Sequence, residues 1–189
     1  MLGKDIRYTI KRLGSNTMQF VGEFDCGNLE INDYINTSDA FYTRNTVNYL
    51  LLEIAENGNK QLIGLLSLSC SAIVKIFDCQ DKNGNPINEF IPAALIEYFA
   101  ITKRYHGLPF DQFGNTTFSE AMFSVFIDLI TNIITKKIGA QYIILHSTRE
   151  AYNFYKKKFY FSEFAANMSV ANNPHVSDCI PMYLMIDSK

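Results

Sequence analysis

The feature that most constrains the fold is a long amphipathic segment between two apolar, strand-like segments. Apolar residues recur at three- and four-residue steps from Phe118 to Ile134, which predicts a helix with one buried face. Ala94 to Thr102 before it and Tyr142 to His146 after it are short and mostly apolar, as buried strands are. A strand, a helix and a second strand in this order predict a right-handed parallel crossover, and so an α/β fold.

Short polar signals predict where the helices begin. Thr117 with Glu120 matches a capping box at the start of the long helix. Ser147 with Glu150 matches a second capping box, which predicts a further helix directly after the strand ending at His146.

The rest of the chain alternates in the way that strands do, with one more helix near the N-terminus. Asn28 can cap a helix that starts at Leu29. Glu56-Asn57-Gly58-Asn59 reads as a hairpin turn, and Asp81 to Pro86 reads as a surface loop. We expect one domain over residues 1–189, with a mixed central sheet of about seven strands and helices on both faces. The further strands are expected at Ile6–Ile10, Val47–Ala55, Gln61–Cys70, Phe159–Phe164 and Pro181–Ile186.

Composition excludes several classes of protein. With 189 residues, 48% of them apolar, the chain is long enough to bury one core. A net charge of −2 gives no basic field of the kind that marks a nucleic-acid binder. The four cysteines form no CxxC pair, so we expect reduced thiols and a cytoplasmic protein. No apolar run reaches about 18 residues, which argues against a membrane span, and the charged N-terminus argues against a signal peptide.

Four motifs, in this order, resemble the GNAT N-acyltransferase superfamily over nearly the whole chain. Phe24-Asp25-Cys26-Gly27 is similar to the opening of the acetyltransferases found as toxin–antitoxin partners. The other three motifs are Gln61 to Leu68, Ile96 to Ile101 with the following Lys103 to Gly107, and Ala151 to Tyr155.

The chain departs from the family pattern in two places. The compact pyrophosphate signature R/Q-x-x-G-x-G/A is missing, because His106-Gly107 is followed by an extended loop from Leu108 to Asn115. The "G-F" pair after Tyr155 is replaced by Phe159-Tyr160-Phe161.

The resemblance implies an acetyl-CoA-dependent N-acetyltransferase whose primary-amine acceptor attacks the thioester directly in a ternary complex. Main-chain groups of a strand would pair with the pantetheine, and a helix N-terminus would hold the pyrophosphate. An ordinary capped helix after a surface loop is the alternative for that terminus. The cofactor-binding residues implied are Phe99, Ala100, Ile101, Gly114, Asn115, Thr116 and Thr117.

Two residues are candidates for the chemistry. Tyr155 matches the family tyrosine that protonates the departing thiolate, since a neutral phenol can donate a proton at pH 7. With eleven tyrosines in the chain, a core aromatic is the alternative. Glu97 is a carboxylate on a largely apolar strand and could be the general base for the amine, or a salt-bridged or edge residue.

The sequence motifs do not identify the amine that would accept the acetyl group. The N-terminal resemblance suggests aminoacyl-tRNA, which a local patch of Lys103, Arg104 and Lys156–Lys158 could contact. It also leaves open an antitoxin partner and a homodimer. The rivals are a catalytically inactive interaction module on the same fold and a thiol enzyme with a reactive cysteine. The histidines and cysteines show no metal-ligand spacing, so no metal and no membrane partner is expected.

Overall fold

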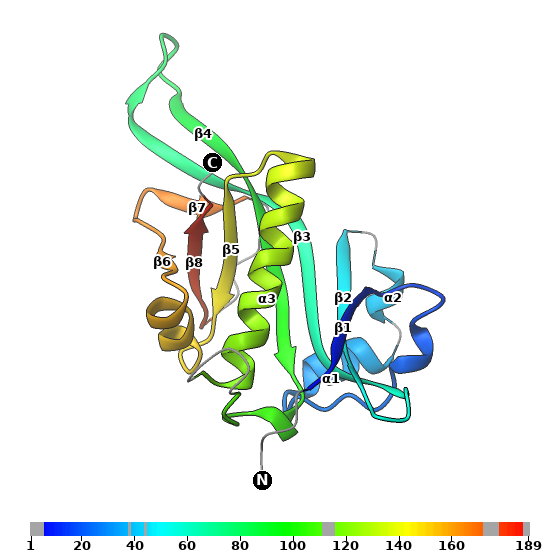
Figure 1. Cartoon of the computed structure of the whole chain (residues 1–189). Coiled ribbons are helices and arrows are strands. Elements are labelled where there is room, and N and C mark those ends of the chain that lie inside the picture. Colours follow the sequence, from blue (N-terminus) through cyan, green and yellow to red (C-terminus); the bar gives the residue numbers. More distant parts are fainter. Residues whose placement is uncertain (1–5, 38, 44, 111–115, 172–177, 187–189) are drawn as a thin grey trace. The chain divides into compact units, whose positions relative to one another are not determined.

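A computed structural model describes residues 6–37, 39–43, 45–110, 116–171 and 178–186 (Figure 1). Eight strands and three α-helices, with four short 3₁₀ or π turns, make up this part of the chain. The elements are β1 (Tyr8–Arg12), η1 (Met18–Phe20), α1 (Leu29–Asn36), α2 (Asp39–Tyr42), β2 (Thr46–Ile54), β3 (Lys60–Gln80), β4 (Pro86–Ile101), η2 (Lys103–Tyr105), α3 (Phe118–Ile133), η3 (Ile134–Ile138), β5 (Tyr142–Ser147), η4 (Phe154–Lys158), β6 (Ser162–Glu163), β7 (Met168–Val170) and β8 (Ile180–Met185).

The strands pair in the order β1-β2-β3-β4-β5-β8-β6, and β7 pairs with β3. β4 and β5 are parallel, from Ala93 opposite Tyr142 to Ile96 opposite Leu145. The predicted crossover through the long helix is therefore confirmed. β1 with β2, β5 with β8 and β6 with β8 are antiparallel, so the sheet is mixed, as predicted.

The chain divides into two compact units, residues 1–68 with 97–127 and residues 69–96 with 128–189. β3, β4 and α3 each contribute residues to both units. The single domain expected over residues 1–189 stays a prediction.

In the first unit, helices cover both faces of the sheet. On one face α1 buries Ile35 in a cluster that contains Leu50, Leu65 and Ala100. Consecutive residues of a strand point to opposite faces, so Phe99 lies on the other face. There its ring centroid is 4.8 Å from that of Phe123 on α3. The prediction of helices on both faces is confirmed here.

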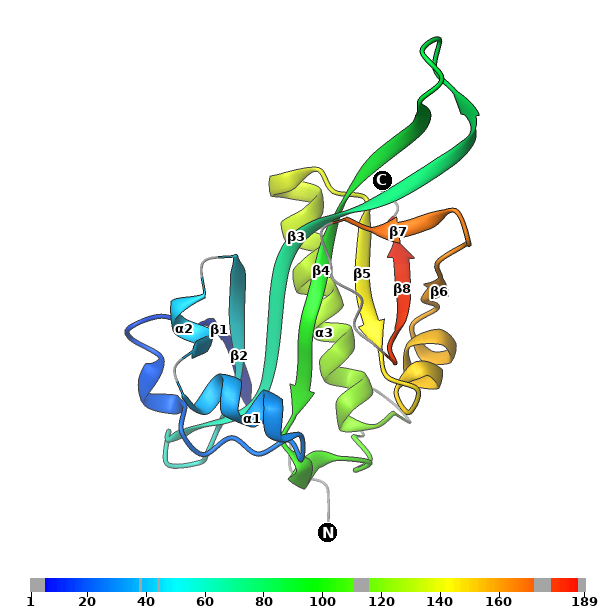
Figure 2. The ribbon, with the colours of Figure 1, turned by 180° about the vertical axis from the view of Figure 1, so that it is seen from behind.

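In the second unit, β3 and β4 run on into a long hairpin. Its base is covered, because β7 pairs with β3 as far as Lys75 and the main-chain N–H of Gln141 donates to the carbonyl of Pro92. Beyond that, every residue from Asp78 to Phe90 is exposed, and the hairpin projects from the rest of this unit (Figures 1 and 2). The predicted surface loop at its tip is confirmed, but the predicted strands, Gln61–Cys70 and Ala94–Thr102, were too short. A hydrophobic pattern in the sequence marks only the buried part of a strand, so it does not indicate that the strand continues into solvent.

The long helix is a core helix of the described chain. The Phe118–Ile138 stretch is long and apolar enough to cross a membrane by length and composition. One face of it is nevertheless packed in the protein interior, since Met122, Phe123, Phe126 and Ile130 are fully buried. Length and composition alone do not distinguish a membrane-spanning helix from a helix in a protein core, whereas burial of its side chains does.

The helix expected after β5 through Phe154 and Tyr155 is present, but it begins later than predicted and takes a π form. Ser147 is the last residue of β5 and is 1% exposed, so it caps nothing. Thr148 takes that role, because its Oγ1 accepts a hydrogen bond from the N–H of Ala151 (3.3 Å). The chain then forms the π turn η4 instead of a regular α-helix. The strand expected at Phe159–Phe164 shortens to β6.

Gly64 on β3 provides a test of packing in the first unit. A Cβ at this position would lie 2.8 Å from Cδ1 of Ile101 and 3.2 Å from Cβ of Leu51. We expect Gly64→Ala to lower the free energy of unfolding by about 1–3 kcal/mol through overpacking, as measured by urea denaturation. Gly14→Ala is the matched control, because no heavy atom lies within 4 Å of the added Cβ. Equal stabilities for the two variants would contradict this account of the packing.

Candidate functional site

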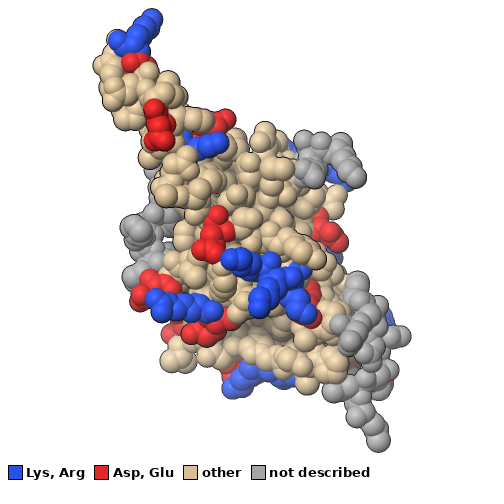
Figure 3. Space-filling view, turned by 90° about the vertical axis from the view of Figure 1, so that its left-hand side faces the viewer, with Lys and Arg blue, Asp and Glu red and all other residues tan. Residues whose placement is uncertain are grey.

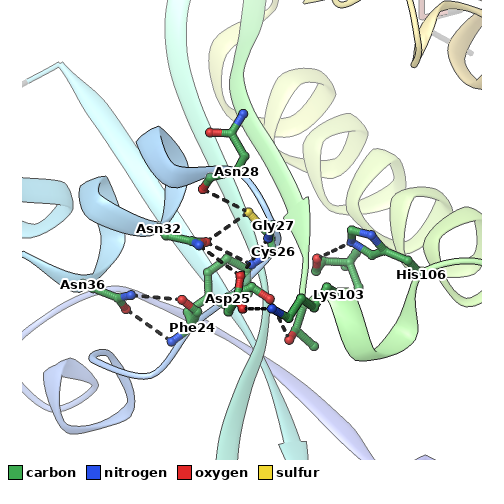
Figure 4. Close-up of polar contacts among 11 residues, drawn as sticks. Phe24, Asp25, Cys26, Gly27, Asn28, Asn32, Asn36, Lys103 and His106 are labelled. Atoms are coloured by element: carbon green, nitrogen blue, oxygen red, sulfur yellow. Dashed lines mark hydrogen bonds and ion pairs between the residues drawn. The ribbon is translucent and has the colours of Figure 1, made fainter.

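Asp25, in the Phe-Asp-Cys-Gly motif, clamps the end of β4 (Figure 4). Its main-chain carbonyl accepts hydrogen bonds from the N–H of Lys103 (2.9 Å) and from Oγ1 of Thr102 (3.0 Å). Its carboxylate pairs with the ammonium of Lys103 and accepts from the N–H of Gly27 (2.8 Å). These partners hold the pKa of Asp25 at about 2, with the Lys103 hydrogen bond as the largest cause.

Three asparagines, four residues apart, attach α1 to the same motif. Asn28 caps α1, as predicted, and accepts from the N–H of Ile31 (3.2 Å). Asn32 donates to the Asp25 carboxylate (3.1 Å), and Asn36 donates to the Phe24 carbonyl (2.9 Å). Sequence reasoning missed Asn32 and Asn36. The i, i+4, i+8 spacing is the signal that could have found them, since it places all three on one helix face.

Cys26 is a structural thiol and not a nucleophile. The residue is 8% exposed, and its Sγ contacts Oδ1 of Asn32 (3.2 Å). Burial raises the pKa of the Cys26 thiol, and it also raises the pKa of Cys179. A raised pKa disfavours the thiolate that a thiol enzyme needs. Neither Cys26 nor Cys179 therefore supports that rival, and the two other cysteines, Cys70 and Cys79, are free and exposed.

The last residues of β4 bring together the predicted pantetheine-binding segment. Ala100 and Ile101 are buried, and Phe99 is half-buried. The ladder with β5 ends at Ile96, so β4 runs on for five residues past its last parallel pair. The Ile101 carbonyl is already engaged, because Nε2 of His106 donates to it (2.8 Å).

Glu97 lies on the same strand but is exposed. The unusual burial that drew attention to it in the sequence is therefore not found. An exposed carboxylate needs no partner to stay charged, so the position is compatible with a base at an accessible edge.

The start of α3 is a complete capping box. The N–H of Thr117 donates to the Glu120 carboxylate (2.8 Å), and the N–H of Glu120 donates to Oγ1 of Thr117 (3.3 Å). Oγ1 of Thr116 donates to the same carboxylate (2.9 Å). The Thr116 hydroxyl and the Thr117 N–H, which could bind a pyrophosphate, thus donate to the Glu120 carboxylate instead. Gly114 and Asn115 lie outside the described residues.

Tyr155 lies in η4, in the second unit. Burial raises the pKa of its phenol to about 12. Its ring centroid is 5.9 Å from that of Phe161, which is 2% exposed. The phenol is therefore neutral, and able to donate a proton, across the physiological pH range.

The segment after Tyr155, where the sequence lacks the "G-F" pair, contains a residue with a positive φ. Tyr160 has a φ of +58°, the left-handed conformation that glycine adopts without strain, and Phe161 is the buried aromatic that follows. Both residues lie just after the π-helical segment η4.

Most of the basic residues expected to contact RNA are paired with carboxylates. Lys103 pairs with Asp25, Arg104 pairs with Glu53, and Lys156 lies 2.9 Å from Glu163. Lys157 and Lys158 are exposed. The local field over these residues is weaker than the sequence suggests, because neighbouring carboxylates cancel much of it.

Solved structures that resemble this chain include KacTA and AtaTR complexes and an AtaT structure that is described as a toxin. A chain of the KacTA–DNA complex covers 95% of this chain and 93% of its own length, with a TM-score of 0.64 and 14% identity. AtaTR bound with acetyl-CoA covers 94% and 93%, with a TM-score of 0.62 and 16% identity. AtaT complexed with acetyl-methionyl-tRNAfMet covers 93% and 94%, with a TM-score of 0.60 and 16% identity. The fold expected from the GNAT resemblance is confirmed. No protein-family model and no curated protein matches the sequence.

Asp25 gives the protein a predictable response to acid. Its pKa falls from 3.8 to about 2 on folding. The carboxylate therefore stabilises the fold above about pH 4, and this contribution is lost as the pH falls through about 2. We expect Asp25→Asn to lower stability at pH 7 and to flatten the fall in stability between these pH values, as followed by circular dichroism.

The exposed ion pair with Lys103 is only part of this effect. Lys103→Gln keeps the Asp25 main-chain hydrogen bonds and should have a smaller effect, which high salt also reproduces. If Asp25→Asn and the unaltered protein lose stability in parallel on acidification, the clamp does not work through the carboxylate.

The left-handed backbone at Tyr160 predicts a stabilising substitution. Tyr160→Gly should raise the free energy of unfolding by about 1 kcal/mol, because glycine adopts this conformation without the Cβ clash. Tyr160→Ala is the control, since it removes the same ring and keeps the Cβ. Indistinguishable urea midpoints for the two variants would show that the backbone is not strained.

Proposed function

We propose that this protein is an N-acetyltransferase that moves an acetyl group from acetyl-CoA to a primary amine in a ternary complex. The observation that carries the proposal is the fold shared with AtaTR bound with acetyl-CoA, over 94% of this chain. The half-buried phenol of Tyr155, whose pKa is raised, is the second support, because it is a proton donor of the kind that such a reaction needs.

For the cofactor, main-chain groups of Phe99 and Ala100 are proposed to pair with the pantetheine amides. Because His106 and the Asp25 clamp fix the end of β4, these groups would be preorganised. The pyrophosphate is proposed to bind at the start of α3, near Thr116 and Thr117. There the Glu120 carboxylate would first have to release the Thr117 N–H and the Thr116 hydroxyl, from which it now accepts hydrogen bonds.

In the proposed reaction the amine nitrogen forms a bond to the thioester carbonyl carbon, and the carbon–sulfur bond then breaks. Tyr155 gives its phenolic proton to the departing thiolate, which is a much stronger base than a neutral thiol. The amine loses one proton, and Glu97 is proposed to accept it, directly or through water. AtaT and KacT have both been solved with a tyrosine replaced by phenylalanine, the substitution that removes a phenolic hydroxyl and leaves the ring.

The acceptor is proposed to be an aminoacyl-tRNA. AtaT has been solved with acetyl-methionyl-tRNAfMet, and also with the C-terminus of its antitoxin AtaR. An antitoxin partner and a homodimer are proposed for this chain on the same ground.

A catalytically inactive interaction module is the second candidate. The capping box at α3 favours it, because the Glu120 carboxylate engages the Thr117 N–H and the Glu120 N–H is engaged by Oγ1 of Thr117, at the terminus where a pyrophosphate would bind. A chain that had lost its cofactor could keep this helix start permanently closed.

Calorimetric titration with acetyl-CoA separates the two candidates. Dissociation constants in the micromolar range support the transferase. No binding up to about millimolar, a loss of roughly 4 kcal/mol, supports the interaction module. Glu120→Gln tests the reason, since it removes the charge and keeps a capping side chain, and it should tighten binding if the carboxylate opposes the pyrophosphate.

Replacement of the proposed acid should affect turnover and not cofactor affinity. We expect Tyr155→Phe to lower turnover by roughly 10²-fold, with the dissociation constant for acetyl-CoA nearly unchanged. Because the pKa of Tyr155 is raised to about 12, its deprotonation should not lower turnover anywhere below about pH 11. Tyr152→Phe, three residues earlier in the chain, is the control and should keep its turnover. Full activity in Tyr155→Phe would remove this residue from the mechanism.

A further inference from the structure

Tyr160 combines a strained backbone with an exposed ring. The left-handed conformation costs a side-chain-bearing residue about 1 kcal/mol or more relative to glycine. The residue is 80% exposed, so its ring buries little apolar surface to offset that cost. Folding alone thus gives no reason for an aromatic residue here, and strained residues of this kind are often functional.

The residues on either side hold Tyr160 rigidly. Phe161 is buried, and the Phe159 ring centroid is 5.1 Å from that of Phe154. The N–H groups of Phe159 and Phe161 both donate to the carbonyl of Tyr155 (3.2 Å each). The exposed ring is therefore presented on a fixed frame that is hydrogen-bonded to the proposed catalytic residue.

Positive charge lies next to this ring in the sequence. Lys156, Lys157 and Lys158 precede it, and all three are exposed. Glu163 partly neutralises Lys156, whereas Lys157 makes no ion pair with a carboxylate of the described residues. In Figure 1 the segment that contains η4 lies on the left-hand side, and Figure 3 shows that side face-on. Lys and Arg side chains gather in the middle of that face.

We propose that Tyr160 and Lys157 form a binding site for a nucleotide, with the base stacked on the ring and a phosphate attracted by the lysine. A flat exposed aromatic stacks on any base, and an ammonium group is a compact partner for phosphate. Adjacent lysines disfavour a cationic ligand, and they add nothing for an apolar one. This inference rests on the proposed function, whose ligands offer two sources of such a nucleotide: the acceptor RNA and the adenosine phosphate of CoA.

The test measures binding without catalysis. A fluorescein-labelled, short single-stranded RNA is titrated with the full chain at low salt, and CoA is titrated separately by calorimetry. Tyr160→Ala should weaken binding of the nucleotide source by about 10-fold, whereas Tyr160→Phe, which keeps the ring, should bind as the unaltered protein does. For RNA, Lys157→Gln should reduce the slope of log affinity against log salt by about 0.7.

The two arms identify the source of the nucleotide. A loss confined to RNA assigns the site to the acceptor, and a loss confined to CoA assigns it to the cofactor. Unchanged affinity for both ligands in Tyr160→Ala, or no binding of either by the unaltered protein, overturns the inference. Because thermal unfolding of each variant is followed in parallel, a folding defect is recognised separately. RNA binding that depends on Tyr160, without any affinity for acetyl-CoA, would defeat the proposed function and leave this site standing.

Discussion

The last five residues of β4 hold their unit together, because a strand directs consecutive side chains to opposite faces. Ala100 joins the cluster under α1, and Phe99 packs against Phe123 of α3. This short stretch therefore contributes side chains to two hydrophobic layers, one against α1 and one against α3. A shift of the strand would disturb the packing of both layers. The Asp25 clamp fixes the same stretch at its end, through hydrogen bonds to Thr102 and Lys103. The backbone groups proposed to bind the cofactor thus lie on a stretch held by two hydrophobic layers and by hydrogen bonds at its end.

The two capping boxes show how far the sequence could predict the fold. Thr117 and Glu120 form the predicted reciprocal hydrogen bonds. Ser147 and Glu150 have the same spacing, yet Ser147 remains paired in β5 with Ile180 of β8. A local signal of about 1 kcal/mol is overridden when sheet pairing engages the same residue. Helices and strands with a buried face were predictable, whereas the length of the β3–β4 hairpin was not, since its outer part has no buried face to read.

The residues of the candidate site could be predicted where they belong to a sequence motif. They could not be predicted where they are linked only by hydrogen bonds in the folded chain. Tyr155 and the end of β4 followed from the family resemblance, and their roles stay predictions. The Asp25 network was missed because its partners Asn32 and Lys103 lie far apart in the sequence. Only the folded chain brings them together. The regular spacing from Asn28 to Asn36 was visible, but polar residues on a short helix usually face solvent, so periodicity alone gave no reason to single them out.

The β3–β4 hairpin also bears on how the chain reaches its fold. Its two strands are joined by a tight turn from Asp81 to Asn85, closed by hydrogen bonds within five residues. Such local contacts form fast, because little chain entropy is lost when the loop closes. The parallel pairing of β4 with β5 must wait until the whole of α3 has been placed between them. β4 thus takes part in both the earliest and the latest strand pairing expected of this sheet. We expect the β3–β4 hairpin to form first and β5 to pair with it afterwards.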